Sequence, residues 1–86
     1  MKITIQATPN PNALKFILPQ KMFAKPVNIS SPDAAADHPL AAQLMALDGV
    51  YNVFMVQDFV TVNKLPDVPW DPLRDQAQAL IGAYFD

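Results

Sequence analysis

Few side chains in this sequence are of the types that carry out covalent or metal chemistry. The chain has no cysteine, so it offers no thiolate ligand, no cysteine nucleophile and no disulfide. Its single histidine, His38, stands near Asp33 and Asp37, but the number and spacing of these groups fit no usual metal site. Helix capping before Pro39 explains this string more simply. We therefore predict that the chain binds no metal and no cofactor.

The remaining nucleophiles and acids form no recognisable catalytic group. A nucleophilic hydroxyl needs an adjacent base, whereas Ser30 and Ser31 stand in a polar stretch that is typical of a loop. Asp71 and Asp75 share one helical face, but acids near a helix start act as caps and interact favourably with the helix dipole. Neither of the two glycines belongs to a phosphate-binding loop. The sequence predicts that the protein is not an enzyme.

The string Thr8-Pro9-Asn10-Pro11-Asn12, followed closely by Lys15, is better suited to recognition than to catalysis. Its prolines stiffen the backbone, and its amides and hydroxyl offer hydrogen-bonding groups. These groups can bind a ligand or a partner, or they can bond their own backbone and stabilise a turn. Both interpretations stay open.

Composition and charge narrow the class of protein and of partner. Of the 86 residues, 51% are hydrophobic and 16% are charged, which is typical of one small folded domain over residues 1–86. The apolar runs are too short to span a bilayer, and the alternating N-terminus lacks the core of a signal peptide, so we expect a cytoplasmic protein. The net charge is −2, with +4 in residues 1–30 and −6 in residues 31–86. Such a chain is poorly suited to bind nucleic acid.

The hydrophobic periodicity predicts the secondary structure. Alternation of polar and apolar residues indicates strands over 2–7, 13–18, 50–56 and 59–64, with an optional edge strand over 25–29. Helical spacing indicates one helix that is capped by Asp37 and ended by Asp48-Gly49, and a second that is capped by Asp71 and ends near Tyr84. The order β-β-(β)-α-β-β-α predicts an α+β two-layer sandwich, with a mostly antiparallel sheet and both helices on one face.

The two-residue connection Gln57-Asp58 predicts an antiparallel hairpin and determines which of its side chains share a face. The core face is wholly apolar: Val53, Met55, Val60 and Val62. The outer face mixes aromatic, aliphatic and polar side chains: Asn52, Phe54, Val56, Phe59, Thr61 and Asn63, joined by Thr4, Gln6, Lys15 and Ile17.

Two helices cover only one face of such a sheet, so the outer face is predicted to bind a partner. The predicted partner-binding residues, including the polar string near the N-terminus, are Thr8, Asn10, Asn12, Lys15, Ile17, Phe54, Val56, Phe59 and Thr61. Two alternatives are that residues 19–36 fold over this face, or that the hairpin register is shifted by one residue.

Three strings of the sequence are distinctive enough to suggest a family. They are Thr8-Pro9-Asn10-Pro11-Asn12-Ala13-Leu14-Lys15-Phe16; His38-Pro39-Leu40-Ala41 through Leu47-Asp48-Gly49-Val50 to Asp58-Phe59-Val60-Thr61-Val62-Asn63-Lys64; and Trp70 with Leu73 before the last helix. In this order the strings resemble the N-terminal domain of the Nfu and NifU-like iron–sulfur scaffold family. The resemblance implies the fold of that domain and a setting in iron–sulfur cluster biology. The family's cluster-binding Cys-x-x-Cys motif belongs to a separate C-terminal domain, and this chain has no cysteine.

The resemblance and the outer face together favour a non-catalytic accessory or partner-binding module in iron–sulfur cluster assembly or delivery. The expected partner is a cysteine-bearing iron–sulfur carrier or recipient, and we expect no nucleic acid and no membrane to bind. The alternative is a self-associating structural protein or a small-ligand-binding protein unrelated to clusters. In that case the same face would form a homodimer.

Overall fold

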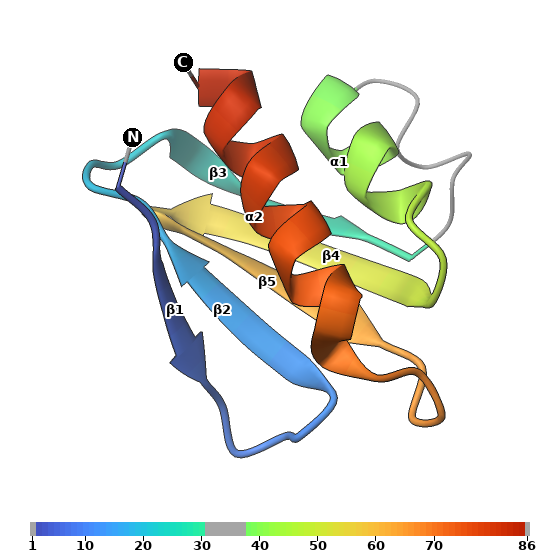
Figure 1. The fold of residues 1–86 in the computed structure, drawn as a ribbon. Coiled ribbons are helices and arrows are strands. Elements are labelled where there is room, and N and C mark those ends of the chain that lie inside the picture. Colours follow the sequence, from blue (N-terminus) through green and yellow to red (C-terminus); the bar gives the residue numbers. More distant parts are fainter. Residues whose placement is uncertain (1, 31–37, 86) are drawn as a thin grey trace.

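Five strands and two helices follow one another in the predicted order. The computed structural model describes residues 2–30 and 38–85, and its elements are β1 (Thr4–Ala7), β2 (Ala13–Ile17), β3 (Phe23–Ile29), α1 (Pro39–Met45), β4 (Val50–Gln57), β5 (Phe59–Lys64) and α2 (Trp70–Phe85). The strands form one antiparallel sheet in the order β1-β2-β5-β4-β3. Both helices lie on the same face of this sheet (Figure 1). The predicted α+β two-layer architecture is therefore confirmed.

The β4–β5 hairpin has the predicted register. Val56 pairs with Phe59, and Phe54 pairs with Thr61. Gln57 adopts a φ of 53° at the connection, a left-handed conformation that a two-residue hairpin turn commonly requires. The four side chains assigned to the core face are fully buried: Val53, Met55, Val60 and Val62. The alternative register is thus excluded.

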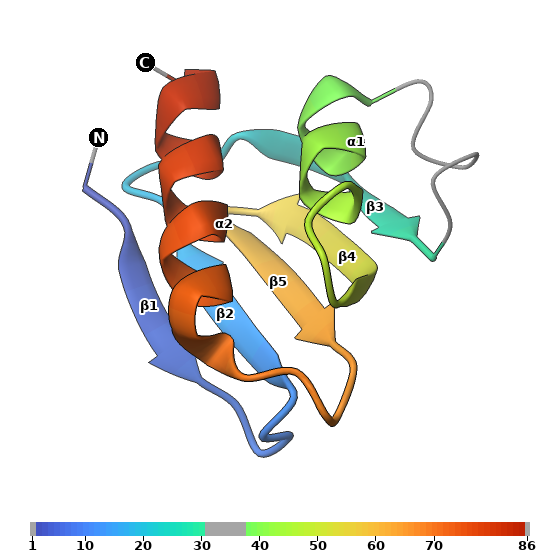
Figure 2. The same cartoon turned by 45° about the vertical axis from the view of Figure 1, so that its right-hand side comes forward.

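The two helices lie side by side on this core face (Figure 2), and each buries apolar side chains at helical spacing against it. α2 buries Leu73, Ala77 and Ile81, and α1 buries Leu40, Ala41, Leu44 and Met45. Tyr84, in the last turn of α2, has an exposed fraction of 41%. Its ring stays outside the core because Ile81 fills the sheet-facing position of this last turn. The Tyr84 ring stacks on His38, with 6.4 Å between the ring centroids.

The start of α1 differs from the prediction. His38, and not Asp37, is the N-cap: its Nδ1 accepts a hydrogen bond from the Ala41 amide at 3.3 Å. A residue before proline is confined to extended backbone, which is the conformation that an N-cap needs, and His38 precedes Pro39 with φ −134° and ψ 102°. Asp33 and Asp37 lie outside the described residues.

Gly49 turns the chain into β4. The helix was predicted to end at Asp48-Gly49, but α1 ends earlier, at Met45, with Ala46 as its C-cap. Gly49 therefore does not terminate the helix directly. Its φ is +95°, and a Cβ at this position would lie 2.7 Å from a methyl carbon of Val68. Its carbonyl oxygen also accepts a hydrogen bond from the Leu65 amide at 2.8 Å. The turn and the close approach of the 65–68 loop both require glycine.

Substitution of this glycine tests the close approach. We expect Gly49→Ala to lower the free energy of unfolding by about 1–3 kcal/mol, because alanine is strained at this φ and its methyl group would collide with Val68. The matched control is Gly82→Ala, whose Cβ would meet only Ile3, at 3.8 Å. Inside a helix that change should stabilise by about 0.5–1 kcal/mol. Urea unfolding measures both, and equal effects of the two changes would contradict the assignment.

Candidate interaction surface

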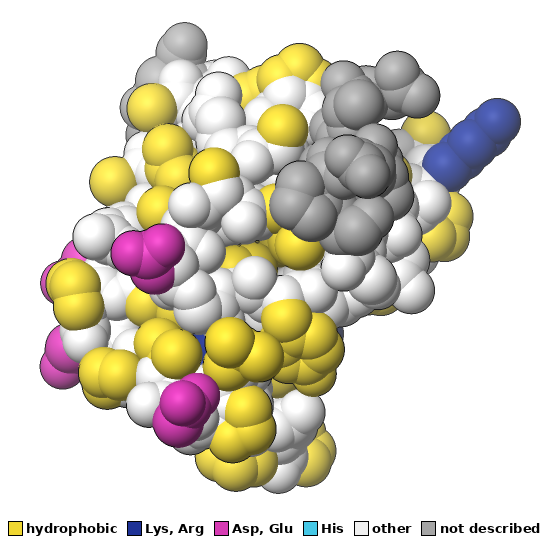
Figure 3. Space-filling model, turned by 90° about the vertical axis from the view of Figure 1, so that its right-hand side faces the viewer, with side chains coloured by type: hydrophobic (Ala, Val, Ile, Leu, Met, Phe, Trp, Pro, Cys, Tyr) yellow, Lys and Arg dark blue, Asp and Glu magenta, His cyan; other side chains and the backbone are white. Residues whose placement is uncertain are grey.

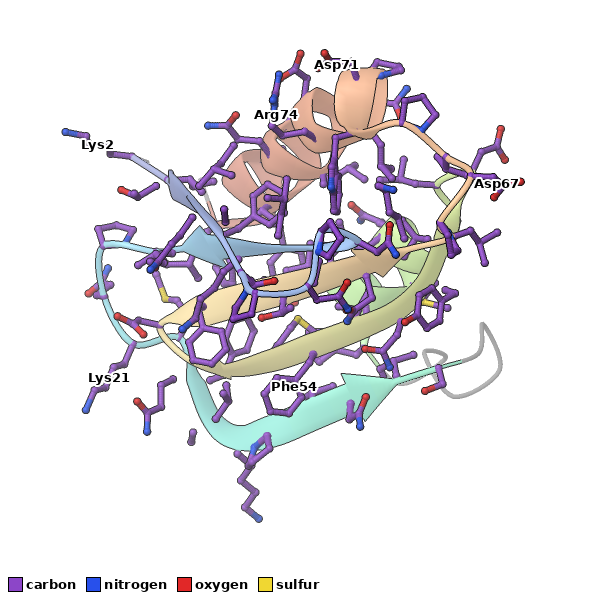
Figure 4. The ribbon with its side chains drawn as sticks, turned by 90° about the horizontal axis from the view of Figure 1, so that it is seen from below. Lys2, Lys21, Phe54, Asp67, Asp71 and Arg74 are labelled. Atoms are coloured by element: carbon purple, nitrogen blue, oxygen red, sulfur yellow. The ribbon has the colours of Figure 1, made fainter. Side chains whose placement is uncertain are left out.

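The sheet face turned away from the helices carries most of the predicted partner-binding residues. The strand registers place them in two adjacent rows across β2, β5 and β4: Lys15, Thr61 and Phe54 in one, and Ile17, Phe59 and Val56 in the next. We call these six residues the outer patch. All six side chains are half-buried, since cross-strand neighbours on one face shield one another. In Figure 4, Phe54 points to the side of the sheet away from α2, which carries Asp71 and Arg74.

Two aromatic rings and a lysine form the centre of the outer patch. The ring centroids of Phe54 and Phe59 are 6.2 Å apart, and the rings are tilted by 53°. The Nζ of Lys15 lies 4.2 Å from the centroid of the Phe59 ring. A cation at this distance over a ring face is attracted by the ring quadrupole. Phe59 is therefore held between a second ring and an ammonium group.

A row of amides borders the outer patch on β5, β4 and β3. The Asn63 side-chain amide donates to the Asn52 oxygen at 2.9 Å. The Asn52 amide in turn donates to Asn28 Oδ1 at 2.8 Å and to Ser30 Oγ at 3.0 Å. Asn52 and Asn63 were predicted on this face, whereas Asn28 in β3 and Ser30 just after it were not, because this segment has only a weak strand pattern. The row provides a polar rim beside the apolar centre.

The Thr8–Asn12 loop lies at one end of the sheet, where β1 turns into β2. The Asn10 side chain accepts a hydrogen bond from the Asn12 amide at 2.9 Å, and the Thr8 hydroxyl accepts one from the Asn10 amide at 3.1 Å. The Thr8 hydroxyl also lies 2.8 Å from the Asn10 carbonyl oxygen, to which it donates. These side chains thus bond their own backbone, as in one of the two interpretations, and partner binding by the loop stays a prediction.

A nearly buried lysine connects this loop to the rest of the fold. Lys64, at the end of β5, is 5% exposed, and its Nζ donates to Asn12 Oδ1 at 2.9 Å and to the Leu65 carbonyl at 3.3 Å. The same Nζ lies 5.6 Å from the centroid of the Trp70 ring, and the Trp70 indole N–H donates to the Pro11 carbonyl at 3.0 Å. No local pattern in the sequence indicates this cluster, because its hydrogen bonds join Lys64 to Asn12, 52 positions away, and Trp70 to Pro11, 59 positions away. The three distinctive strings of the sequence meet here.

Other features that bear on function are few in the part of the chain that the structure describes. A groove between the end of α1 and the start of α2 has Leu47, Asp48, Val68 and Asp71 among its lining residues. Residues 2–30 and 38–85 contain no group of three or more potential metal ligands. None of the described helices is long and apolar enough to cross a membrane.

Comparison with known proteins identifies relatives over the whole fold. The family model described as "Scaffold protein Nfu/NifU N terminal" matches residues 3–86. The human "NFU1 iron-sulfur cluster scaffold homolog, mitochondrial" is 39% identical over 87 residues, which cover 99% of this chain and 34% of that protein. "NifU-like protein 5, mitochondrial" of Arabidopsis thaliana is 41% identical over 91 residues, with 99% and 31% covered. The chain spans about a third of the length of these curated relatives.

Solved structures share the fold. The solution structure of a NifU-like protein from Saccharomyces cerevisiae has a TM-score of 0.84 at 27% identity, over 98% of this chain and 77% of that one. The crystal structure of protein SAV1430 from Staphylococcus aureus has a TM-score of 0.78 at 26% identity, over 94% of this chain and 99% of that one.

The relatives correct the predicted localisation. The human and Arabidopsis relatives are named as mitochondrial proteins, which contradicts the cytoplasmic localisation expected from the sequence. That expectation rested on an N-terminal pattern that reports a β-strand, and a strand pattern carries no information about the compartment.

The contact between Asn12 and Lys64 is open to a direct test. Asn12→Ala removes the nearer of the two acceptors of a nearly buried ammonium, and we expect it to lower the free energy of unfolding by about 1–3 kcal/mol. Asn12→Asp keeps an acceptor and should lose little. Chemical denaturation measures each change. In a Lys64→Met background the alanine change should cost much less, and a full loss there would contradict the contact.

The family match, the similarity over nearly the full chain, and the meeting of the three distinctive strings agree with one another. The chain therefore belongs to the family of Nfu/NifU scaffold proteins, and it corresponds to their N-terminal domain.

Proposed function

We propose that this protein is a non-catalytic module that binds a protein partner in iron–sulfur cluster assembly or delivery, with the outer patch as its contact surface. The observation that carries the proposal is a continuous apolar centre, made of Ile17, Phe54, Val56 and Phe59, on the sheet face opposite the helices. The amide row gives this centre a polar rim. Apolar surface with a polar rim is typical of protein interaction sites.

The position of β3 supports the accessibility of the outer patch. Residues 23–29 extend the sheet beside β4, in its plane, and do not fold across the outer face. The described residues of the 18–22 connection run around the end of the sheet, where the Met22 amide donates to the Gln57 carbonyl at 2.8 Å. The alternative that residues 19–36 cover the face thus finds no support in residues 19–30, and residues 31–36 lie outside the described part.

The chemistry of clusters supports a cysteine-bearing partner. Protein-bound iron–sulfur clusters are held mainly by cysteine thiolates, and this sequence has none. The curated relatives are named as cluster scaffolds, and this chain spans only about a third of their length. A module of this kind acts on clusters through another protein that supplies the thiolates, either a carrier or a recipient.

Cluster reconstitution tests the first part of this proposal. Incubation of the purified protein with ferrous iron and sulfide under anaerobic conditions should give no stable visible absorption beyond that of the buffer, because thiolate ligands are absent. The control adds a cysteine-bearing cluster protein to the same mixture, which should then develop the chromophore. A stoichiometric cluster on this chain alone would overturn the proposal.

A substitution in the outer patch tests the second part. Phe59→Asp should leave the fold intact by circular dichroism, because the side chain lies on the outer face, and should abolish capture of cysteine-rich cluster proteins from the native lysate. Leu65→Asp is the matched control, since Leu65 is 45% exposed and lies off the patch. If Phe59→Asp unfolds, Thr61→Arg places a charge on the same face without removing the ring.

Equal capture by both variants and the unchanged protein would contradict a binding role of the outer patch. The homodimer alternative is separated by sedimentation velocity. A dimer that persists on dilution to micromolar concentration, and that Phe59→Asp dissociates, would show self-association through the same surface.

A further inference from the structure

The exposed charged side chains of the described chain are separated by sign toward its two ends, whereas the half-buried Asp58 and Arg74 and the buried Lys64 lie among charges of the opposite sign. Lys2 precedes β1 and Lys21 lies in the β2–β3 connection, so both stand at the end of the sheet where the Ile17–Phe59–Val56 row lies. The exposed acids of α2 and of the loops before β4 and α2 lie toward the opposite end: Asp48, Asp67, Asp71 and Asp75. Figure 3 shows acidic side chains on one side and a basic side chain projecting on the other, and Figure 4 shows Lys2 and Lys21 well apart from Asp67.

Among the positions that the strand registers place on the outer face, Lys15 is the one charged side chain. The outward positions that the registers place around Lys15 are uncharged: Thr4, Gln6, Ile17, Asn28, Asn52, Phe54, Val56, Phe59, Thr61 and Asn63. Within residues 2–30 and 38–85 the ion pairs are those of Arg74 with Asp71 and Asp75, so no described acid pairs with Lys15. Lys15 is half-buried, and its ammonium interacts with the Phe59 ring and has no described counter-ion.

A cation that has no counter-ion among the described residues and lies within an apolar patch discriminates between partners by charge. A carboxylate that approaches Lys15 gains a charge-assisted hydrogen bond in a partly desolvated site, whereas a basic group is repelled there. Lys2, Lys21 and Lys25 are exposed and extend the positive potential beyond the patch. The neighbouring β4–β5 turn contributes one acid, Asp58. Potential of this kind steers an acidic partner toward the surface.

We propose that the partner docks on the outer patch through a segment in which acidic side chains flank apolar ones. The apolar side chains cover Phe54, Phe59 and their aliphatic neighbours, and one carboxylate pairs with Lys15. This inference rests on the proposed function and adds to it the chemistry of the partner.

A single-stranded nucleic acid would also bring negative charge, and bases stack on exposed aromatic rings. Two observations favour a protein segment instead. The Lys15 ammonium lies over one face of the Phe59 ring, at 4.2 Å from the ring centroid, and a base stacking on that face would have to displace it. The chain as a whole has a net charge of −2, which opposes binding to a polyanion.

Two short synthetic peptides test the proposal. Both carry the same leucine and tryptophan positions, and the intervening positions are glutamate in one peptide and lysine in the other. Titration into isotope-labelled protein should show that the glutamate peptide binds at least about tenfold more tightly, and that its affinity falls as salt is added. The amide signals of Lys15, Phe54 and Phe59 should shift.

Charge-reversal variants localise the effect. Lys15→Glu and Arg74→Glu change the net charge equally, but only Lys15 lies on the outer patch. Lys15→Glu should reverse the preference between the peptides, and Arg74→Glu should preserve it. Lys15→Gln removes the charge without adding one and should abolish the preference, which keeps the test decisive if the reversal disturbs folding.

Several outcomes would overturn the proposal: no binding of either peptide, equal binding of both, shifts that map away from the patch, or equal effects of the two reversals. Tighter binding of single-stranded oligothymidine than of the glutamate peptide would assign the surface to nucleic acid. Capture of cluster proteins that depends on Phe59 but is unchanged by Lys15→Glu would overturn the acidic partner and leave the proposed function standing.

Discussion

The register of the β4–β5 hairpin is the constraint on which the other features depend. Side chains alternate between the two faces of a sheet, so a slip of one residue would carry Phe59 into the core and Val60 out of it. The left-handed Gln57 and the two-residue connection set the register locally. β5 then pairs with β2 on its other edge, and the faces of both N-terminal strands follow. One turn thereby separates the core from the outer patch.

The two helices determine which face of the sheet is buried as the core. Because α1 and α2 cover the same face, the apolar side chains of the opposite face have no described element to pack against, and they shield one another. Phe54 and Phe59 pack together, and Lys15 covers one ring. For the partner proposed above, a surface that is ordered in advance lowers the entropic cost of binding.

The most recognisable residues of the sequence form contacts that join distant parts of the fold. Asn12, Lys64 and Trp70 connect the first loop, the central strand and the start of α2 through hydrogen bonds and a cation–ring contact. Recognition of the family therefore rests on the residues that hold this domain together. The surface proposed to act in function consists of more ordinary residues on the strands. This division fits a domain whose chain lacks the cysteines of cluster chemistry.

The sequence by itself determined the elements, the hairpin register and the composition of both faces, because period-two alternation and a short turn are local properties. The cap that it predicted for the first helix, Asp37, was wrong by one residue, because His38 directly before Pro39 is the N-cap. Only the tertiary structure decided the strand order, the approach of Val68 to Gly49, the burial of Lys64 against Asn12 and the position of Lys15 over Phe59. These contacts join residues far apart in the chain, and no local pattern specifies which distant partner a side chain meets.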